Sequence, residues 1–254
     1  MNRYDGELGK EAYIQSLFSS IAPKYDLLNS VLSLTRHKAW RRFAASKSGL
    51  AQGDSALDVC CGTGDFACEL ANKVGRSGSV TGVDFAPPMV ELAAKKAKRA
   101  GLANVSFQVG NACRLPFGDN SFDCVTVGFG LRNVADLHAA VAEMTRVVKP
   151  GGRVVCLEIS KVRGRLLSLP WKLYFYVLTP FTASLFRARR SAYEYLPQSV
   201  KEFVSREQLA EEFVSCGLRD VSFSDLTFGT VCVHVGVKPG ESSALRETAP
   251  ASPE

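Results

Sequence analysis

The sequence has little histidine and lacks the cysteine spacing of a metal or redox motif. Its histidines are His37, His138 and His234, and no two of its eight cysteines form a C-x-x-C pair. A zinc site is therefore not expected, and no metal ligand is predicted. Most of the cysteines lie in apolar, strand-like runs, which favours reduced, buried thiols in a cytosolic protein over disulfides.

Other absences narrow the class of protein. The opening residues, MNRYDGELGKEAY, contain no apolar run, so no secretory signal is expected, and no internal repeat is visible. The chain has 254 residues, 46% of them hydrophobic and 22% charged, which suits one α/β domain or two small ones. The net charge of +6 is compatible with nucleic acid or an anionic membrane and does not choose between them.

Residues 159–193 contain no acidic side chain at all. Pro170, Lys172 and Pro180 interrupt the apolar middle of this segment, so a membrane-spanning helix is not expected. Together with amphipathic N-terminal helices, the segment could form a lid and a surface that meets anionic headgroups. A helical cap over an ordinary core is the alternative. The basic residues of the segment are Lys161, Arg163, Arg165, Lys172, Arg187, Arg189 and Arg190.

Strand-like and helical patterns alternate through the middle of the chain, which predicts βαβ units and a parallel sheet. Near the end, a helix at residues 206–217 precedes two strand-like runs split by a short turn, which predicts an antiparallel hairpin. The fold class is therefore α/β, with a seven-stranded, mostly parallel sheet and helices on both faces. The earlier strands are expected at 55–60, 79–85, 105–110, 122–129 and 153–159, and the helices between them at 64–74, 86–101 and 135–148.

One domain spanning residues 1–254 is predicted, with three appendages. Residues 1–50 are expected to form an N-terminal helical lid, since apolar residues recur there at helical spacing from Tyr13 onward. Residues 160–200 are expected to form a helical cap over the substrate. The polar, proline- and serine-rich tail at 239–254 is expected to be disordered.

The stretch ALDVCCGTGDFACEL places a glycine turn between a strand and a helix. Gly62 and Gly64 flank Thr63, shortly after a strand that we expect to end at Asp58. Small residues at such a turn let a ligand touch the backbone, and the N–H groups of the next helix face its polar end. A tight turn without a ligand is the alternative, because short glycine patterns are common.

A second carboxylate supports a nucleoside ligand. Asp84 ends the next strand, 20 residues beyond Gly64, where a carboxylate accepts hydrogen bonds from ribose hydroxyls. Its alternative role is the N-cap of the following helix. A dinucleotide fits poorly, because Ala67 replaces the third glycine of G-x-G-x-x-G and Asp65 would repel a pyrophosphate while suiting a cation.

The segments LDVCCGTGD, GVDF, VGNACRLPFGDNSFDCVTV and VVKPGGRVV together resemble class I S-adenosylmethionine-dependent methyltransferases. The resemblance implies a Rossmann-like fold and a sulfonium cofactor. In the pattern D-x-G-x-G-x-G of that superfamily, Cys60 stands for the first glycine. We regard this as a mild departure, and Cys60 and Cys61 as small residues beside the cofactor.

More specific motifs narrow the resemblance. FSSIAPKYDLLNSVLSLTRHKAWRR, LPFGDNSFDCVTVGFGLRNV, EMTRVVKPGGRVVCLEISK, YEYLPQSVKEF and LTFGTVCVHVGVK resemble the UbiE family of quinone-pathway C-methyltransferases, over roughly residues 11–238. The resemblance implies methylation of a ring carbon of a polyprenylated hydroquinone. Two substrates are open, demethylmenaquinol and the benzoquinol precursor of ubiquinone.

Other functions are alternatives to quinol methylation. The first is methylation of another small aromatic or lipid acceptor. A nucleic-acid-binding module or an RNA methyltransferase is another, because RHKAWRRF reads as a basic helix. No RNA-binding appendage or aromatic, basic sheet face is evident, so no nucleic-acid partner is expected.

The resemblance also implies which residues contact the cofactor. Gly128 stands where the family often has serine, so only a backbone contact is expected there. The expected cofactor-binding residues are Asp58, Cys61, Gly62, Thr63, Gly64, Asp84, Phe85, Asn111, Ala112 and Gly128.

The substrate side needs a group that promotes loss of the hydroquinone proton, because the ring carbon becomes nucleophilic as a phenolate. Arg132 and Asn133 follow the fourth strand, and we expect Arg132 to stabilise the phenolate; pairing with a structural carboxylate is its alternative role. Asp26 is a candidate base, with a helix cap as its alternative. His138 is expected to be an ordinary surface or half-buried residue. Lining of the acceptor cavity is expected from Tyr25, Tyr193 and Tyr195.

The expected cofactor is S-adenosylmethionine, and its product is S-adenosylhomocysteine. The expected partners are a polyprenylated quinol, an anionic membrane surface and a second copy of the chain. A cytoplasmic location, peripheral at the inner surface of the membrane, follows from these expectations.

Overall fold

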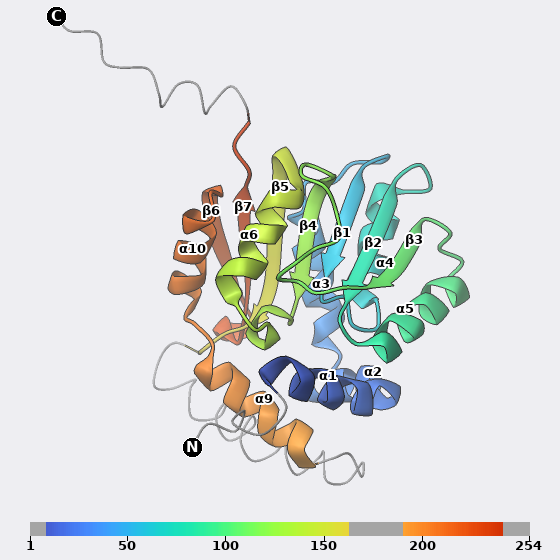
Figure 1. Ribbon diagram of the computed structural model, residues 1–254, viewed down its shortest axis with the longest axis vertical. Helices are drawn as coiled ribbons and strands as arrows, with labels where there is room; N and C mark the ends of the chain where they lie inside the picture. The colour runs from blue at the N-terminus through green and yellow to red at the C-terminus, as the bar shows by residue number, and fades with distance from the viewer. Residues whose placement is uncertain (1–8, 163–189, 241–254) are drawn as a thin grey trace, which may run out of the picture.

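The computed structural model describes residues 9–162 and 190–240, and its centre is a seven-stranded sheet (Figure 1). The strand order is β3-β2-β1-β4-β5-β7-β6. β7 runs antiparallel to the other six strands of this sheet, which all point the same way. The predicted fold class and hairpin are confirmed. The strands are β1 Ser55–Val59, β2 Ser79–Asp84, β3 Val105–Val109, β4 Phe122–Gly128, β5 Val148–Ile159, β6 Arg219–Leu226 and β7 Val231–Val237.

The register of the inner strands brings the polar residues to one edge. Val59 of β1 pairs with Val83 of β2 and with Val127 of β4. The chain therefore leaves all three strands at the same level, and the residues that follow meet at the carboxyl edge of the sheet. Open α/β sheets place their ligands at this edge.

Helices bury the apolar side chains of both faces. On one face, α6 (Leu137–Val147) and α10 (Arg206–Ser215) pack over a cluster that includes Met144 and Phe213. On the other face, α3 (Arg36–Ser46) and α4 (Asp65–Val74) contribute Ala44, Phe66 and Leu70. The helix α5 (Pro87–Arg99) contacts β2 and β3. Strands covered on both faces explain the nearly continuous apolar runs in the sequence.

Helices from both ends of the chain lie across the carboxyl edge (Figure 1). They are α1 (Lys10–Ile21), the short helix η1 (Ala22–Lys24), α2 (Tyr25–Leu32) and α9 (Arg190–Glu202). α1 contacts both α5 and α9. The predicted N-terminal lid thus divides into two parts, because α3 belongs to the sheet face while α1 and α2 cover the strand ends.

Some predicted boundaries differ from the structure. β1 extends to Val59, so Asp58 lies within the strand, and β5 begins at Val148, not at residue 153. Of the predicted cap at 160–200, residues 163–189 lie outside the described residues, as does most of the predicted disordered tail. All eight cysteines are free thiols. Within the described ranges, no helix combines the length and the apolar character needed to cross a membrane.

A candidate active site of joined cavities at the carboxyl edge

The glycine turn folds back under the end of β2. Cys61 donates its N–H to Val83 O over 3.0 Å, and Gly64 donates to Cys61 O over 2.9 Å. Gly64 has a φ of +82°, and a Cβ there would lie 2.9 Å from Ala93 and Phe107, so glycine is required. α4 begins at once, which leaves its first N–H groups beside the turn.

Cys60 also has a left-handed backbone, with a φ of +54°. Its replacement of the glycine is therefore not as mild as the sequence suggested, because an L side chain in this region costs about 1–2 kcal/mol. Cys61 is buried and Cys60 half-buried, and burial raises the pKa of both thiols well above the usual value. Neutral thiols at the turn are consistent with the expected packing role.

Asp84 holds the turn against the second strand. One carboxylate oxygen accepts the N–H of Gly62 and the other that of Ala86, each over 2.9 Å. The side chain is 7% exposed, and burial raises its pKa although these hydrogen bonds oppose the rise. The N-cap of α5 is Ala86, so Asp84 is not the cap that was its alternative role. Each oxygen keeps acceptor capacity on the side of the cavity.

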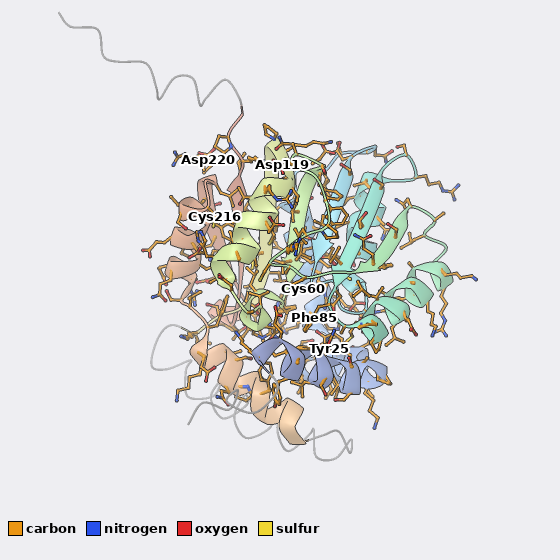
Figure 2. The ribbon with its side chains drawn as sticks, in the orientation of Figure 1. Tyr25, Cys60, Phe85, Asp119, Cys216 and Asp220 are labelled. Atoms are coloured by element: carbon orange, nitrogen blue, oxygen red, sulfur yellow. The ribbon has the colours of Figure 1, made fainter. Side chains whose placement is uncertain are left out.

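A cleft of about 660 Å³, its opening to solvent included, is here called the turn cavity and runs from the glycine turn toward the start of α5. Backbone with small side chains forms one end, and Phe85, Asn111 and Ala112 form the other (Phe85 and Cys60 are labelled in Figure 2). Gly128 lines it too, where a Cβ would lie 3.0 Å from the Phe66 ring. Further lining residues are Glu11, Phe18, Tyr25, Cys60, Gly62, Asp84, Met89, Gly110, Phe129, Gly130, Asn133, Val134 and Ala135.

A polar recess of about 290 Å³ lies beneath the turn, lined by Asp58, Arg41 and Asp65 among others. Asp58 is 1% exposed; its Oδ1 accepts the Thr126 hydroxyl over 2.8 Å, whereas Oδ2 has no partner. Burial raises the pKa of Asp58 to about 7. A buried carboxylate oxygen without a donor has a strong tendency to attract a cation or a proton.

A network of charges joins the N-terminal helices to the turn. Asp65 lies 3.1 Å from Arg41 of α3 and 2.5 Å from Lys96 of α5. Burial would raise the pKa of Asp65, but the Arg41 and Lys96 cations outweigh it and lower that pKa. Because Asp65 is already paired with two cations, it is less available to a cationic ligand than the sequence implied.

Asp26 belongs to the same network, and this removes the geometric basis for its role as a base. Its carboxylate accepts the Thr63 hydroxyl over 2.5 Å and lies 2.7 Å from Lys96. It lines none of the three cavities described at this edge and makes no cap hydrogen bond in α2. The Thr63 side chain points into this network, and Thr63 lines the polar recess and not the turn cavity.

A second, largely apolar cavity of about 1060 Å³ opens beside the first. Tyr25 and Phe129 line both cavities, so they form the wall between them. Phe129 has a φ of +60°, a strained conformation of the kind that clusters at functional sites. The other residues lining this apolar cavity are Asn29, Leu32, Ser33, Leu34, Arg36, His37, Trp40, Arg132, Ile159, Thr227, Thr230 and Val231.

Arg132 makes the structural pairing that was its alternative role, and its action on a phenolate stays a prediction. Its Nη1 donates to Glu158 Oε1 over 2.5 Å and to Phe129 O over 2.6 Å, which is the expected structural pairing. It also lines the apolar cavity, and its Nε–H is buried without a partner. Burial disfavours the charged guanidinium, yet Glu158 outweighs this and raises its pKa. Arg132 thus keeps its positive charge, and its Nε–H donor has no hydrogen-bond partner.

The remaining predicted residues take different places. Asn133 lines the turn cavity; its Nδ2 donates to Phe129 O over 3.2 Å, and its Oδ1 accepts the Tyr195 hydroxyl over 2.9 Å. Tyr195 therefore supports Asn133 from α9; it does not line the apolar cavity but lines, with Arg132, a further cavity, and its contact with the acceptor stays a prediction. The Tyr193 side chain lies outside the described part of the chain.

Sequence reasoning missed several residues of the site. Glu158 ends a buried strand, and an acid in such an apolar run is an available signal. His37 lines the apolar cavity, and burial, helped by Arg41, lowers its pKa to about 4, so it is neutral at neutral pH. Arg41 is 7% exposed, and so the helix RHKAWRRF does not present all of its charges to a partner. No sequence pattern marks which of its basic residues turns inward.

Comparisons with known proteins agree with this geometry. The model of the ubiE/COQ5 methyltransferase family matches residues 7–238. A demethylmenaquinone methyltransferase of Bacillus cytotoxicus is 43% identical over 230 residues, 91% of this chain and 97% of the relative. One of Shouchella clausii is 41% identical over 91% of this chain and 98% of its own.

Solved structures are similar in fold. A Haemonchus contortus phosphoethanolamine N-methyltransferase 2, in complex with S-adenosyl-L-methionine, has a TM-score of 0.64 at 17% identity, over 92% of this chain and 61% of that one. A SAM-dependent methyltransferase from Aquifex aeolicus has a TM-score of 0.61 at 20% identity, over 84% of this chain and 96% of that one. With the family match covering nearly the whole described structure, the chain belongs to the ubiE/COQ5 methyltransferase family.

Proposed function

We propose that the protein transfers a methyl group from S-adenosylmethionine to a ring carbon of demethylmenaquinol. The observation that carries the proposal is the shared wall: Tyr25 and Phe129 separate a cavity at the glycine turn from an apolar cavity with a buried arginine. A cofactor in one and a lipophilic ring in the other would meet at this wall. Family membership and the name shared by the close relatives support the reaction.

The turn cavity fits the nucleoside part of the cofactor. Asp84 keeps acceptor capacity toward the cavity and so can bind the two ribose hydroxyls. Phe85 and Met89 offer apolar surface to a flat base, and Asn111 offers an amide at its edge. Glycine at 62 and 128 lets the cofactor approach the backbone closely.

The polar recess fits the amino-acid end of the cofactor. The unpartnered Oδ2 of Asp58 would accept an ammonium group, and Arg41 would attract the carboxylate. This assignment gives a partner to the buried carboxylate oxygen of Asp58 that has none.

The apolar cavity fits a quinol ring with the beginning of a prenyl tail. Trp40 supplies flat apolar surface, and the Trp40 indole is held by a hydrogen bond to Thr227 Oγ1 over 2.9 Å. The free Nε–H of Arg132 is the donor we assign to the ring hydroxyl. A donor in a dry site stabilises the phenolate form and makes the adjacent ring carbon nucleophilic.

Bound S-adenosylmethionine supplies an electrophilic methyl group, so the protein has to supply position and charge. Glu158 and the Phe129 carbonyl hold Arg132 in place, and Tyr195 holds Asn133. Tyr25 and Phe129 exclude water between the two cavities. Burial raises the pKa of Tyr25, so its hydroxyl stays neutral and can donate a hydrogen bond.

We also propose that the mouth of the apolar cavity faces an anionic membrane, from which the tail would enter. Leu34 on the cavity wall is 69% exposed and Phe228, next to the lining residue Thr227, is 76% exposed. Arg36 and Lys38 are exposed nearby in sequence. Apolar side chains flanked by cations suit the interface of an anionic bilayer. Flotation with anionic vesicles at low salt should recover the protein, and Leu34→Ser with Phe228→Ser should weaken it.

The test of the reaction is transfer of labelled methyl from S-adenosylmethionine to a panel of quinols under reducing conditions. Demethylmenaquinol with a short prenyl chain should gain one methyl on carbon, identified by mass spectrometry and NMR. The matching demethylated benzoquinol tests the alternative substrate, and the oxidised quinone is the control that lacks the phenol. Label in the benzoquinol alone would replace the proposed substrate; label in neither, with cofactor bound, would overturn the proposal.

A further inference from the structure

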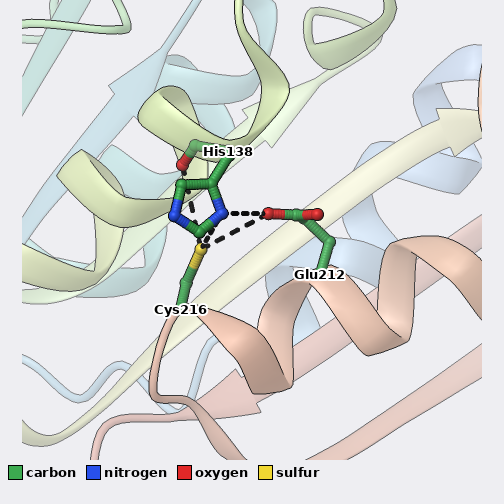
Figure 3. Close-up of side chains that lie close together, drawn as sticks. All are labelled: His138, Glu212 and Cys216. Carbon is green, nitrogen blue, oxygen red and sulfur yellow. Dashed lines mark hydrogen bonds and ion pairs between the residues drawn. The ribbon is translucent and has the colours of Figure 1, made fainter.

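We propose that His138, Glu212 and Cys216 form a zinc-binding site on the outer face of the protein. His138 comes from the first turn of α6, whereas Glu212 and Cys216 come from the end of α10 (Figure 3). One imidazole nitrogen, one carboxylate oxygen and one thiol sulfur lie within 4.8 Å of one another. The site is separate from the cavities of the active site, and Cys216 lies far from Cys60 and Phe85 (Figure 2).

The distances between the three atoms approach those of a tetrahedral ion. Bonds of about 2.0–2.1 Å to nitrogen or oxygen and about 2.3 Å to sulfur give edges of about 3.5 Å between sulfur and nitrogen and about 3.3 Å between nitrogen and oxygen. Cys216 Sγ lies 3.6 Å from His138 Nδ1 and 3.6 Å from Glu212 Oε1. His138 Nδ1 lies 2.6 Å from Glu212 Oε1, so that edge alone has to open, by about 0.7 Å.

The present contacts of Glu212 show what an ion would replace. Its Oε1 accepts a hydrogen bond from His138 Nδ1 and one from the Cys216 thiol, whereas the Ser215 hydroxyl donates to Glu212 O over 2.8 Å. Donors from two side chains thus converge on one oxygen, and a cation at their centre would take over the attraction. The His138 side chain is 64% exposed and that of Glu212 25%, so an ion can reach the site and keep a water as its fourth ligand.

The ligand types select the ion. Imidazole and thiolate favour Zn²⁺ over Mg²⁺ or Ca²⁺, which take oxygen ligands. Binding replaces the thiol proton by a sulfur–zinc bond and releases that proton to solvent. The imidazole proton moves from Nδ1 to Nε2, so that Nδ1 can donate its lone pair. The bound ion would fasten the start of α6 to the end of α10, two helices that cover the same face of the sheet.

The experiment uses the reduced full-length protein, freed of metal by chelation and carrying no polyhistidine tag. Titration with Co²⁺ should give a thiolate-to-cobalt absorption band and the visible bands of a tetrahedral ion at one equivalent, and Zn²⁺ should remove them by competition. The Tm should rise with free Zn²⁺, because an ion that binds only the folded chain stabilises it.

Matched variants decide the ligands. Cys216→Ser, Glu212→Gln and His138→Gln should each weaken Co²⁺ binding at least tenfold, and Cys216→Ser should abolish the thiolate band. Cys68→Ser is the control, because Cys68 is also a half-buried helical thiol whose pKa burial raises to about 11, as for Cys216. Circular dichroism confirms that each variant is folded. A band that survives Cys216→Ser, a band lost equally in Cys68→Ser, or no tetrahedral spectrum at one equivalent would each overturn the proposal. None of these outcomes depends on methyl transfer.

Discussion

The cofactor half and the acceptor half of the active site are built in different ways. The turn cavity and the polar recess take Asp58, Asp84 and Asn111 from neighbouring strands of the sheet or from the turns that follow them. The apolar cavity draws its wall from α2, α3, β5 and the segment before β7, which are far apart in the chain. A ligand that needs hydrogen bonds can be held by a short local motif. An apolar ligand needs surface, and surface comes from many elements.

Of the substitutions that distinguish the cofactor half from the acceptor half, the largest effect is expected for a change at Asp84. Asp84→Asn removes the charge that we assign to the ribose hydroxyls, and hydrogen bonds to charged groups contribute about 1.5–3 kcal/mol each. The cofactor Kd, measured by calorimetry, should rise about 100-fold. Asp119→Asn is the matched control at an exposed carboxylate away from the cavities (Figure 2). Equal affinity of both variants would show that the carboxylate does not bind the sugar.

Arg132 should affect the acceptor half alone. Arg132→Lys keeps the positive charge beside Glu158 but lacks the free Nε–H, so kcat should fall about 100-fold, as for loss of one donor to a developing oxyanion. The cofactor Kd should change little. Arg146→Lys, at an arginine paired with Glu143 and Asp119, is the control. A normal kcat for Arg132→Lys would assign Arg132 to structure only. Arg132→Met should unfold more easily, by about 3–5 kcal/mol, because it leaves Glu158 buried and unpaired.

Asp58 should link cofactor binding to pH. Burial raises its pKa to about 7, and only the ionised form attracts an ammonium group. The affinity for the cofactor should therefore rise about tenfold between pH 6 and pH 8, where ionisation is nearly completed. The raised pKa of Asp58 stabilises the folded protein when the pH is below the pKa of this carboxyl in the unfolded chain, and this contribution is lost as the pH rises through about 7. Because the cofactor binds the ionised carboxylate, it should stabilise the protein most at the higher pH.

Asp58→Asn is the control for this dependence. The variant should bind the cofactor weakly and with little change between pH 6 and pH 8. A pH dependence that persists in Asp58→Asn would assign it to another group, such as the cofactor amine itself.

The smallest effect is expected at the two adjacent cysteines. Cys60→Gly relieves a left-handed backbone but loses some packing, so the free energy of unfolding should stay within about 1 kcal/mol of the parent. Cys61 has no such strain and is 8% exposed, so Cys61→Gly should cost about 1–2 kcal/mol more. Urea unfolding measures both. Equal losses would mean that the strain at Cys60 contributes nothing.

The sequence predicts which residues gather at the glycine turn, but not how their side chains are oriented. The spacing of Gly62, Gly64 and Asp84 places them at one edge of a parallel sheet, because strand ends follow from the alternating pattern and the carboxyl ends of parallel strands meet at one edge. It does not show that Thr63 turns toward Asp26 and Lys96, since hydrogen-bond partners contributed by α2 and α5 are distant in the chain. For the same reason the sequence predicts Asp26 as a candidate base and does not show its pairing with Lys96.

The sequence by itself determined the sheet, its hairpin and the glycine turn, because hydrophobic periodicity and turn residues act over short distances, and the resemblance of its motifs indicated the family. Only the tertiary structure decided that Glu158 neutralises Arg132, that Tyr25 and Phe129 share a wall, and that His138 meets Glu212 and Cys216. Except for Glu212 and Cys216, which lie 4 residues apart, these groups are separated by 26 residues or more along the chain, so no local pattern contains them. Close packing of the helices on the sheet brings them together.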